Sequence, residues 1–193
     1  MKTKCLAVLD TNVLVSAMYS ELSPPGEILK LVEAENIIPI FDKRILKEYC
    51  DVLQYSKFKC VFTDEIKKDT FYTVVSAGIC VDDVYKTTQA IKDSKDIPFF
   101  EVKETIEELP SSLITGNIKD FPKKDPFILT PREALCVLDS FEVFISAKEN
   151  YDKDFQKIVD SIIKTDKYTS GQELLDDIFK DVKIKTDRAK CIS

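Results

Sequence analysis

The stretch Cys5-Leu6-Ala7-Val8-Leu9-Asp10-Thr11-Asn12 decides the fold class, because a short apolar run ends abruptly on a carboxylate. Such a run near the N-terminus is typical of a strand buried on both faces in a parallel sheet. Ligands of these sheets bind just beyond the carboxyl ends of the strands. Asp10 therefore stands where a metal or phosphate site would be built. The alternative is that Asp10 or Asn12 simply caps the next helix.

Segments with the patterns of strands and helices alternate along the chain. Further strands are expected at 37–41, 78–81, 113–115 and 127–129, and helices at 13–19, 27–34, 42–54, 64–76, 98–108 and from Pro131 onward. Pro39 lacks a backbone donor, which favours an edge position or a distortion for its strand. The alternation predicts an α/β fold with a mostly parallel sheet of four to five strands between helices.

The character of the chain changes after about residue 140. Residues 151–163 have an amphipathic pattern, and Ser170-Gly171-Gln172-Glu173 is a capping box that would open another helix. We therefore divide the chain into a domain of residues 1–140 and a helical extension of residues 141–193, packed on the domain or appended to it. These helices either complete the core or supply a docking or dimer surface.

Composition excludes several classes of chemistry. The 193 residues include no His and six Cys, at positions 5, 50, 60, 80, 136 and 191, and none of these forms a CxxC pair. A Ser-His-Asp triad, an imidazole base and a Cys/His zinc site are therefore excluded or disfavoured. The scattered Cys suggest reduced thiols of a cytoplasmic protein. No apolar run is long enough for a membrane span, and the net charge of −6 is not typical of bulk electrostatic binding to nucleic acid.

Acidic and amide side chains recur at the ends of the expected elements. Each has an ordinary explanation in helix capping, turn formation or an ion pair beside the core. Taken together, they lie at or near one end of the predicted sheet: Asp10, Glu48, Asp93, Asp96, Asn117 and Asp120. A cluster of carboxylates is costly through mutual repulsion, and Mg²⁺ or Mn²⁺ is the simplest compensation. Such ions activate water and neutralise a phosphodiester transition state, which is chemistry that needs no His.

The sequence resembles a known family. Five segments over roughly residues 4–138 are similar, in order, to motifs of PIN-domain nucleases, in particular the branch of toxin components of toxin–antitoxin systems: Val8-Leu9-Asp10-Thr11-Asn12, Ile45-Leu46-Lys47-Glu48-Tyr49, Asp93-Ser94-Lys95-Asp96-Ile97-Pro98-Phe99, Leu113-Ile114-Thr115-Gly116-Asn117 and Phe127-Ile128-Leu129-Thr130-Pro131-Arg132-Glu133. The resemblance implies a PIN-like, Rossmann-like three-layer α/β/α fold. It also implies a metal-dependent endoribonuclease that acts on single-stranded RNA, with an antitoxin partner and a homodimer.

The resemblance also implies roles for individual residues. Asp10, Glu48 and Asp96 would be the catalytic acids and would ligate Mg²⁺ or Mn²⁺, with Asn117 at the fourth ligand position. Supporting roles would fall to Asn12, which would orient the first acid, to the strand-end hydroxyl of Thr115, and to the further acids Asp93, Glu101 and Asp120.

This chain departs from the family pattern in two places. Asn117 supplies a neutral oxygen where many members have Asp, and Asp120 stands where the motif often has His. Two other hypotheses therefore stand beside the nuclease. One is a catalytically silent fold that acts by binding an antitoxin or another partner. The other is a phosphohydrolase with Asp10 as nucleophile, although Asn12 cannot serve as the proton donor that this chemistry wants.

Overall fold

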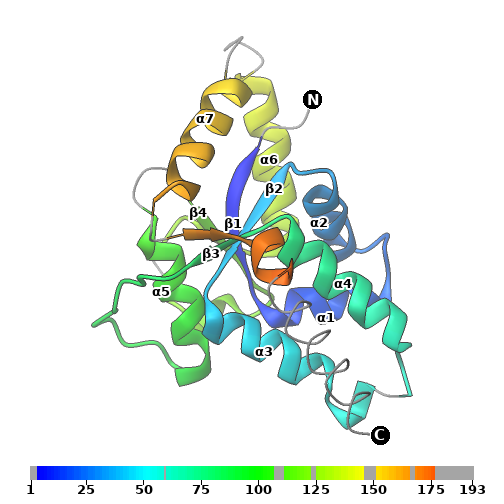
Figure 1. The fold of residues 1–193 in the computed structure, drawn as a ribbon. Helices are drawn as coiled ribbons and strands as arrows, with labels where there is room; N and C mark the ends of the chain where they lie inside the picture. The colour runs from blue at the N-terminus through cyan, green and yellow to red at the C-terminus, as the bar shows by residue number, and fades with distance from the viewer. Residues whose placement is uncertain are drawn as a thin grey trace, which may run out of the picture.

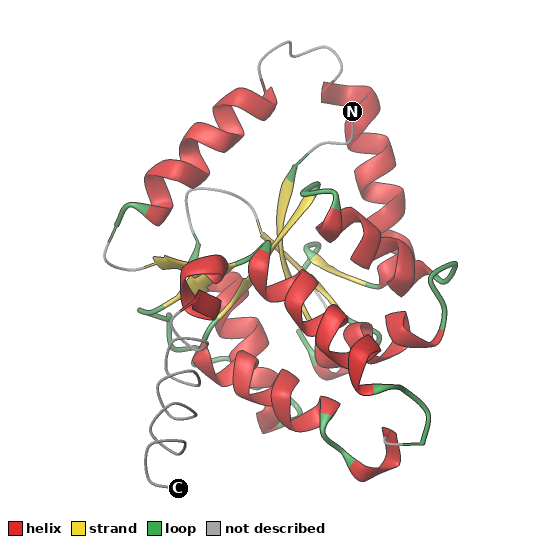
Figure 2. Cartoon of the chain, turned by 45° about the vertical axis from the view of Figure 1, so that its right-hand side comes forward, coloured by secondary structure: helices red, strands yellow, loops and turns green. Residues whose placement is uncertain are grey.

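The computed structural model describes residues 4–58, 60–106, 111–122, 125–145, 151–165 and 168–176. It is built around a six-stranded sheet with helices on both faces (Figures 1 and 2). The elements are β1 Cys5–Leu9, α1 Thr11–Tyr19, α2 Pro24–Glu33, β2 Ile37–Phe41, α3 Lys43–Leu53, η1 Ser56–Phe58, α4 Asp64–Ser76, β3 Ile79–Val81, η2 Ser94–Asp96, α5 Ile97–Thr105, β4 Ser111–Ile114, η3 Ile118–Asp120, β5 Ile128–Leu129, α6 Pro131–Ile145, α7 Tyr151–Ile163 and β6 Tyr168–Ser170.

The sheet has the strand order β5-β4-β1-β2-β3-β6, and every pairing is parallel except that of β6 with β3. On one face α2 contacts α1, α4 and α6, whereas α5 packs on β1, β2 and β4 (Figure 1). The predicted α/β fold with a mostly parallel sheet is confirmed. Because β1 and β4 are neighbours, the segments that follow them meet at one edge of the sheet.

The position of Pro39 differs from the sequence prediction of an edge or distorted strand. Strand β2 lies inside the sheet between β1 and β3, and Pro39 pairs with Ala7. Its carbonyl oxygen faces Gly78, just before β3 begins to pair at Ile79. The N–H and C=O of one strand residue point to the same side. The missing donor of Pro39 therefore falls where β3 has not yet begun, and the interior position costs no ladder hydrogen bond.

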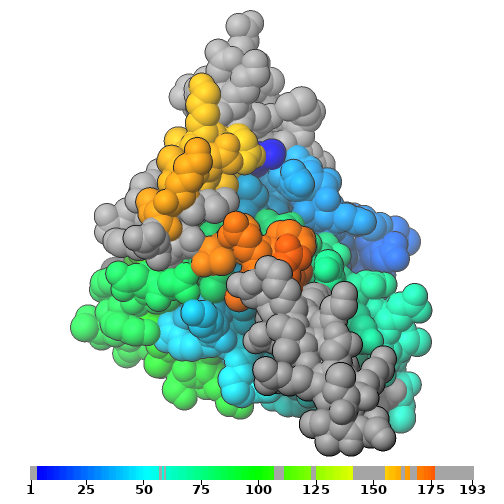
Figure 3. All heavy atoms as spheres, viewed as in Figure 1, coloured from blue at the N-terminus to red at the C-terminus, as the bar shows by residue number. Residues whose placement is uncertain are grey.

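Strand β6 was not predicted, and it explains why the sheet has six strands. Cys80 pairs with Thr169, and the backbone N–H of Gly171 donates to the carbonyl oxygen of Gly78 at 2.8 Å. A side chain at Gly171 would clash with the carbonyl of Val75, so only glycine allows this approach. Figure 3 shows residues 168–176 in dark orange at the centre of this face of the molecule.

Parts of the C-terminal region belong to the core. Phe155, Val159 and Leu175 are buried in the same hydrophobic cluster as the strands. The backbone N–H of Glu173 donates to Ser170 Oγ at 3.3 Å, which is half of the predicted capping box. The division at residue 140 stays a prediction, and Cys191 with the rest of 177–193 lies outside the described residues.

Two further observations bear on the sequence predictions. In the part of the chain that the structure describes, no helix is both long and apolar enough to cross a bilayer. Cys5, Cys50, Cys60, Cys80 and Cys136 are free thiols. Burial raises the pKa of Cys5 to about 12 and that of Cys80 to about 11, so neither ionises near neutral pH.

Candidate active site

Asp10 lies at the carboxyl end of β1, where it also caps α1. It is only 6% exposed, and its Oδ1 accepts the backbone N–H of Asn12 at 3.2 Å. Its Oδ2 accepts two hydrogen bonds, from Asn12 Nδ2 and from Thr115 Oγ1, both at 2.6 Å. Burial nevertheless raises the pKa of Asp10, against these hydrogen bonds. Capping is therefore real but does not account for the second oxygen, which is fixed by side chains from two separate segments.

The turn after β4 is tied to the same carboxylate. Thr115 is fully buried, and its Oγ1 accepts the backbone N–H of Asn117 at 2.9 Å. Asn12 Oδ1 accepts the N–H of Gly116 at 2.9 Å. A Cβ at Gly116 would approach that oxygen to 3.1 Å, which is tight. Asn12 and Thr115 together hold Asp10 and the start of the Asn117 turn in one arrangement.

Glu48 reaches this edge from α3. The hydroxyl of Tyr49 donates to the carbonyl oxygen of Leu9, which fastens α3 to the last residue of β1. The residue before Tyr49 is Glu48, and its Oε1 accepts a hydrogen bond from Thr11 Oγ1 at 3.0 Å. Burial raises the pKa of Glu48, and the charge of Asp10 adds to the increase, whereas Lys95 opposes it.

Asp96 lies between η2 and α5 and is the most strongly perturbed of these acids. Its pKa is raised to about 6, first by burial and then by the negative charges of four other carboxylates, which are Asp10, Asp93, Asp120 and Glu48 in decreasing order. It stands at the N-cap position of α5 but makes no side-chain capping bond there. Asp93 instead caps η2, accepting the N–H of Lys95 at 3.0 Å. Capping therefore explains Asp93 and leaves Asp96 available.

The two remaining predicted acids are neutralised by cations. Asp120 pairs with Lys92 at 2.8 Å, which holds its pKa below the usual range, and it accepts a hydrogen bond from Asn117 Nδ2. Glu101 lies on α5, where Arg44 Nη1 at 2.6 Å and Lys86 Nζ at 3.2 Å donate to its Oε2. Burial acts to raise the pKa of Glu101, but these bonds outweigh it and the pKa is lowered. Glu101 is thus placed in an ion-pair network rather than among the unbalanced acids.

Sequence reasoning missed four contributors. Thr11, whose hydroxyl donates to Glu48, follows Asp10 directly and is buried, but a Thr at a helix start has no distinctive signal. Tyr49 is visible in the sequence only as an apolar-face residue of its helix. Lys92 lies in the loop before η2 and Lys95 lies in η2, and only the folded chain brings their charges close to Asp120 and Glu48.

The oxygen donors of these side chains are of the type that binds a hard divalent cation, but their positions do not form a closed binding site. Among the described residues, no three Asp, Glu or Cys side chains stand close enough together to hold one ion as they are placed. Burial raises the pKa of Asp10, Glu48 and Asp96, and repulsion from other carboxylates adds to it at Glu48 and Asp96, so a cation would favour their charged forms. Carboxylate and amide oxygens are the ligands that Mg²⁺ and Mn²⁺ prefer.

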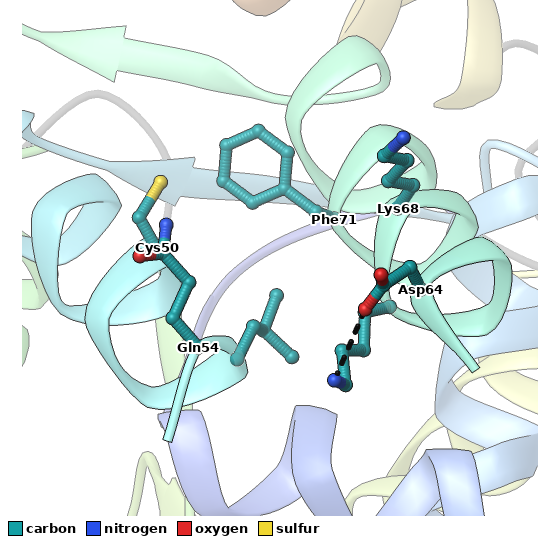
Figure 4. A pocket seen from close by; sticks show the side chains of 7 residues that line it. Cys50, Gln54, Asp64, Lys68 and Phe71 are labelled. Carbon is teal, nitrogen blue, oxygen red and sulfur yellow. Dashed lines mark hydrogen bonds and ion pairs between the residues drawn. The ribbon is translucent and has the colours of Figure 1, made fainter. Parts of the chain in front are cut away.

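A separate cavity of about 650 Å³ opens between α3 and α4 (Figure 4). The described residues that line it are Cys50, Leu53, Gln54, Asp64, Lys67, Lys68 and Phe71. Lys67 is buried there and pairs with the exposed Asp64 at 3.4 Å. None of these residues belongs to the predicted site, so the cavity is distinct from the acid cluster.

Comparison with known proteins shows the family of the chain. The family model described as PIN domain matches residues 6–119, which include all of the predicted site residues except Asp120. The chain belongs to the PIN-domain family. PIN domains are in general nucleases, so membership indicates a nuclease in this coarse sense. An uncharacterized protein of Methanocaldococcus jannaschii is 23% identical over 158 residues, covering 82% of this chain and 96% of that protein. No solved structure matches the chain significantly.

Proposed function

We propose that this PIN-domain protein is a divalent-metal-dependent endoribonuclease that hydrolyses single-stranded RNA, in the manner of a toxin of a toxin–antitoxin system. The observation that carries the proposal is that three buried or half-buried acids from separate segments share one edge of the sheet, where the charge of Asp10 adds to the raised pKa of both Glu48 and Asp96. A carboxylate cluster without matching cations costs stability, and such clusters are characteristic of sites that act on a ligand. An antitoxin partner, a homodimer and a cytoplasmic location accompany this proposal as predictions.

The side chains have distinct tasks in this proposal. Asp10, Glu48 and Asp96 would hold Mg²⁺ or Mn²⁺, with the amide oxygen of Asn117 as a further donor. The bound cation would supply a more acidic water and positive charge against the phosphoryl oxygens. Asn12 and Thr115 orient Asp10 through Oδ2, and Thr11 orients Glu48 through Oε1. With a pKa near 6, the Asp96 carboxylate is ionised at neutral pH and can accept a proton from water.

The test is cleavage of a labelled, unstructured RNA of about 20 nucleotides with Mn²⁺, Mg²⁺ or EDTA. We expect cleavage that needs the metal and that falls by roughly 100-fold or more in Asp10→Asn. Asp69→Asn, which removes the same charge from an exposed site on α4, is the matched control and should cleave normally. Single-stranded DNA and duplex RNA of the same sequence should be poorer substrates.

One observation favours a second candidate, a catalytically silent PIN fold that binds a partner protein. Asn117 is neutral, its amide nitrogen is engaged by Asp120, and no three described acids are arranged around one point. Calorimetric titration with Mn²⁺ distinguishes the two. Binding that is lost in Asp10→Asn supports the nuclease, whereas no binding at millimolar Mn²⁺ together with no cleavage would favour the partner-binding protein.

A further inference from the structure

The segment between β3 and η2, residues 82–93, is a twelve-residue loop without regular structure. Loops of this length in compact domains usually either carry function or are loosely held. This one is anchored. The N–H of Tyr85 donates to Thr105 Oγ1 at 3.0 Å, the N–H of Thr87 donates to Glu101 Oε1 at 3.1 Å, and the N–H of Lys92 donates to the carbonyl oxygen of Asp120 at 3.2 Å.

These anchors give the loop a direction relative to the acid cluster. Thr105 is the last residue of α5, Glu101 lies one turn earlier, and Asp96 precedes the first turn. Nine helical residues span about 13 Å. The loop therefore begins at the far end of α5 and returns along it, until Lys92 reaches Asp120 beside the acids. Figure 1 shows the loop running out beside α5.

The side chains along this path differ from the rest of the chain. The middle of the loop, residues 84–92, contains two Lys and no acid, whereas Asp82, Asp83 and Asp93 lie at its two ends. Tyr85 is 51% exposed, although its backbone is fixed, and Thr88 and Gln89 are exposed next to it. Lys86 and Lys92 pair with Glu101 and Asp120, but their side chains are 68% and 69% exposed.

The two ion pairs leave these lysines available to a ligand. Only the lysine end of each pair is exposed, because the side chains of Glu101 and Asp120 are 5% and 11% exposed. A Lys ammonium has three donors, so each lysine can bind a phosphate while it keeps its carboxylate partner. Glu101 also accepts from a second cation, Arg44 at 2.6 Å, which it shares with Asp42. An exposed aromatic ring followed by lysines on a fixed backbone is the composition of a surface that binds single-stranded nucleic acid.

We propose that the 82–93 loop is the RNA-binding arm of this nuclease, with Tyr85 stacking on a base and Lys86 and Lys92 contacting backbone phosphates of the strand that leads to the acids. Glu101 is then a positioning residue that fixes the loop through Thr87 and Lys86. This inference rests on the proposed ribonuclease function and names how the substrate is held. It also has a geometric consequence: Lys92 lies nearest the acids and Tyr85 farthest, so only an RNA of several nucleotides reaches Tyr85.

Binding is measured by fluorescence anisotropy with a labelled 12-nucleotide RNA, in the Asp10→Asn background so that the probe is not cleaved. We expect Tyr85→Ala to weaken binding about fivefold or more, as for loss of one stacked base, and Tyr85→Phe to bind normally. Lys86→Gln and Lys92→Gln should each reduce the slope of log K against log salt by about 0.7. Tyr72→Ala and Lys30→Gln, which alter another exposed tyrosine and another ion-paired lysine, are the matched controls.

Cleavage kinetics in the otherwise wild-type protein separate binding from chemistry. Tyr85→Ala should raise KM for the 12-nucleotide RNA with kcat unchanged and should not affect a trinucleotide, which is too short to reach the ring. A wild-type protein that cleaves RNA while Tyr85→Ala, Lys86→Gln and Lys92→Gln bind and cleave normally would overturn the arm and leave the nuclease intact. A wild-type protein that neither binds nor cleaves RNA with Mn²⁺ would overturn both.

Discussion

Helices α3 and α5 contribute to two groups of charged side chains, one turn apart. In one group the carboxylate is paired with cations, and in the other the carboxylates are not. Arg44 and Glu101 belong to the first group, and Glu101 accepts hydrogen bonds from two cationic side chains and a backbone N–H. Glu48 and Asp96 belong to the second, where burial and then the charges of other carboxylates raise the pKa of Asp96. The pKa of Glu101 is lowered despite its burial, whereas that of Asp96 is raised to about 6. A paired buried acid serves the framework, and unpaired acids facing one another indicate a site.

The comparison predicts its largest difference in catalysis. Glu48→Gln should reduce cleavage of single-stranded RNA by roughly 100-fold or more, because an amide cannot replace a carboxylate that holds a cation and faces the reaction. Glu101→Gln should leave kcat little changed at saturating RNA, because Glu101 acts through the loop. Single-turnover rates at several RNA concentrations measure both. Equal losses of kcat in the two variants would abolish the distinction between the groups.

The free energy of unfolding should show the reverse order, with the larger loss in Glu101→Gln. Glu101→Gln removes a buried carboxylate that pairs with Arg44 and Lys86, although Arg44 keeps its second pair, with Asp42 at 2.6 Å. Removing one partner of a fully buried pair costs 3–5 kcal/mol. Because Arg44 and Lys86 are partly exposed, we expect the free energy of unfolding in urea to fall by about 2 kcal/mol.

Glu21→Gln is the matched control for this loss. Glu21 forms an exposed pair with Lys30 at 3.6 Å, and its removal should change the free energy of unfolding by less than about 0.5 kcal/mol. A Glu101 variant as stable as this control would mean that the network around Arg44 contributes little, and that Glu101 is no part of the framework.

The sequence predicted most of the fold because the elements that frame the site are locally encoded. The helix from Asp64 to Ser76 and the strand before Asp10 follow from capping residues and apolar periodicity. Strand β6 was missed because Tyr168–Ser170 is three residues long and is a strand only through its pairing with β3. The position of Pro39 was wrong for a similar reason, since where the neighbouring strand begins decides whether a missing N–H matters.

The sequence located the candidate site but could not show which of its acids are paired with cations. Glu48 and Glu101 each precede a buried residue, Tyr49 or Val102, on a helix beside the sheet, and the pattern alone offers no way to tell them apart. What separates them is the position of Arg44, Lys86 and Thr11, which come from other segments and meet the two glutamates only in three dimensions. Burial and pairing of a charge are tertiary properties, so the sequence could list the acids but not their partners.

Metal binding should affect the two groups differently as well. A cation that binds only the folded protein stabilises it by about 2.7 kcal/mol when present at 100 times its dissociation constant. We expect Mn²⁺ to raise the melting temperature of the wild-type protein and of Glu101→Gln, but not that of Glu48→Gln or Asp10→Asn. Differential scanning fluorimetry with Mn²⁺ and with EDTA measures this. Similar shifts in all four proteins would place the bound cation elsewhere.

The smallest expected effect is the contribution of Asp96 to the pH dependence of stability. It is measured without metal, and it reports directly on the cost of ionising this acid. In the folded chain Asp96 keeps its proton up to about pH 6, whereas its ordinary pKa is 3.8. Between these values the unfolded state binds fewer protons than the folded state, so this group lowers stability progressively as pH rises through that window. Because the side chain is only half-buried, we expect the penalty above pH 6 to be about 1 kcal/mol.

Asp96→Asn should therefore be more stable than the wild-type protein in EDTA at pH 7.5, by about 1 kcal/mol, and the difference should shrink towards zero as the pH is lowered to 4. Urea denaturation at both pH values gives the two differences, and Asp69→Asn on the exposed face of α4 corrects for the change in net charge. A gain of equal size at both pH values would instead reflect the hydrogen bonds of the amide. In that case the acids at this edge would not repel one another, and the contrast with the Arg44 network would lose its electrostatic basis.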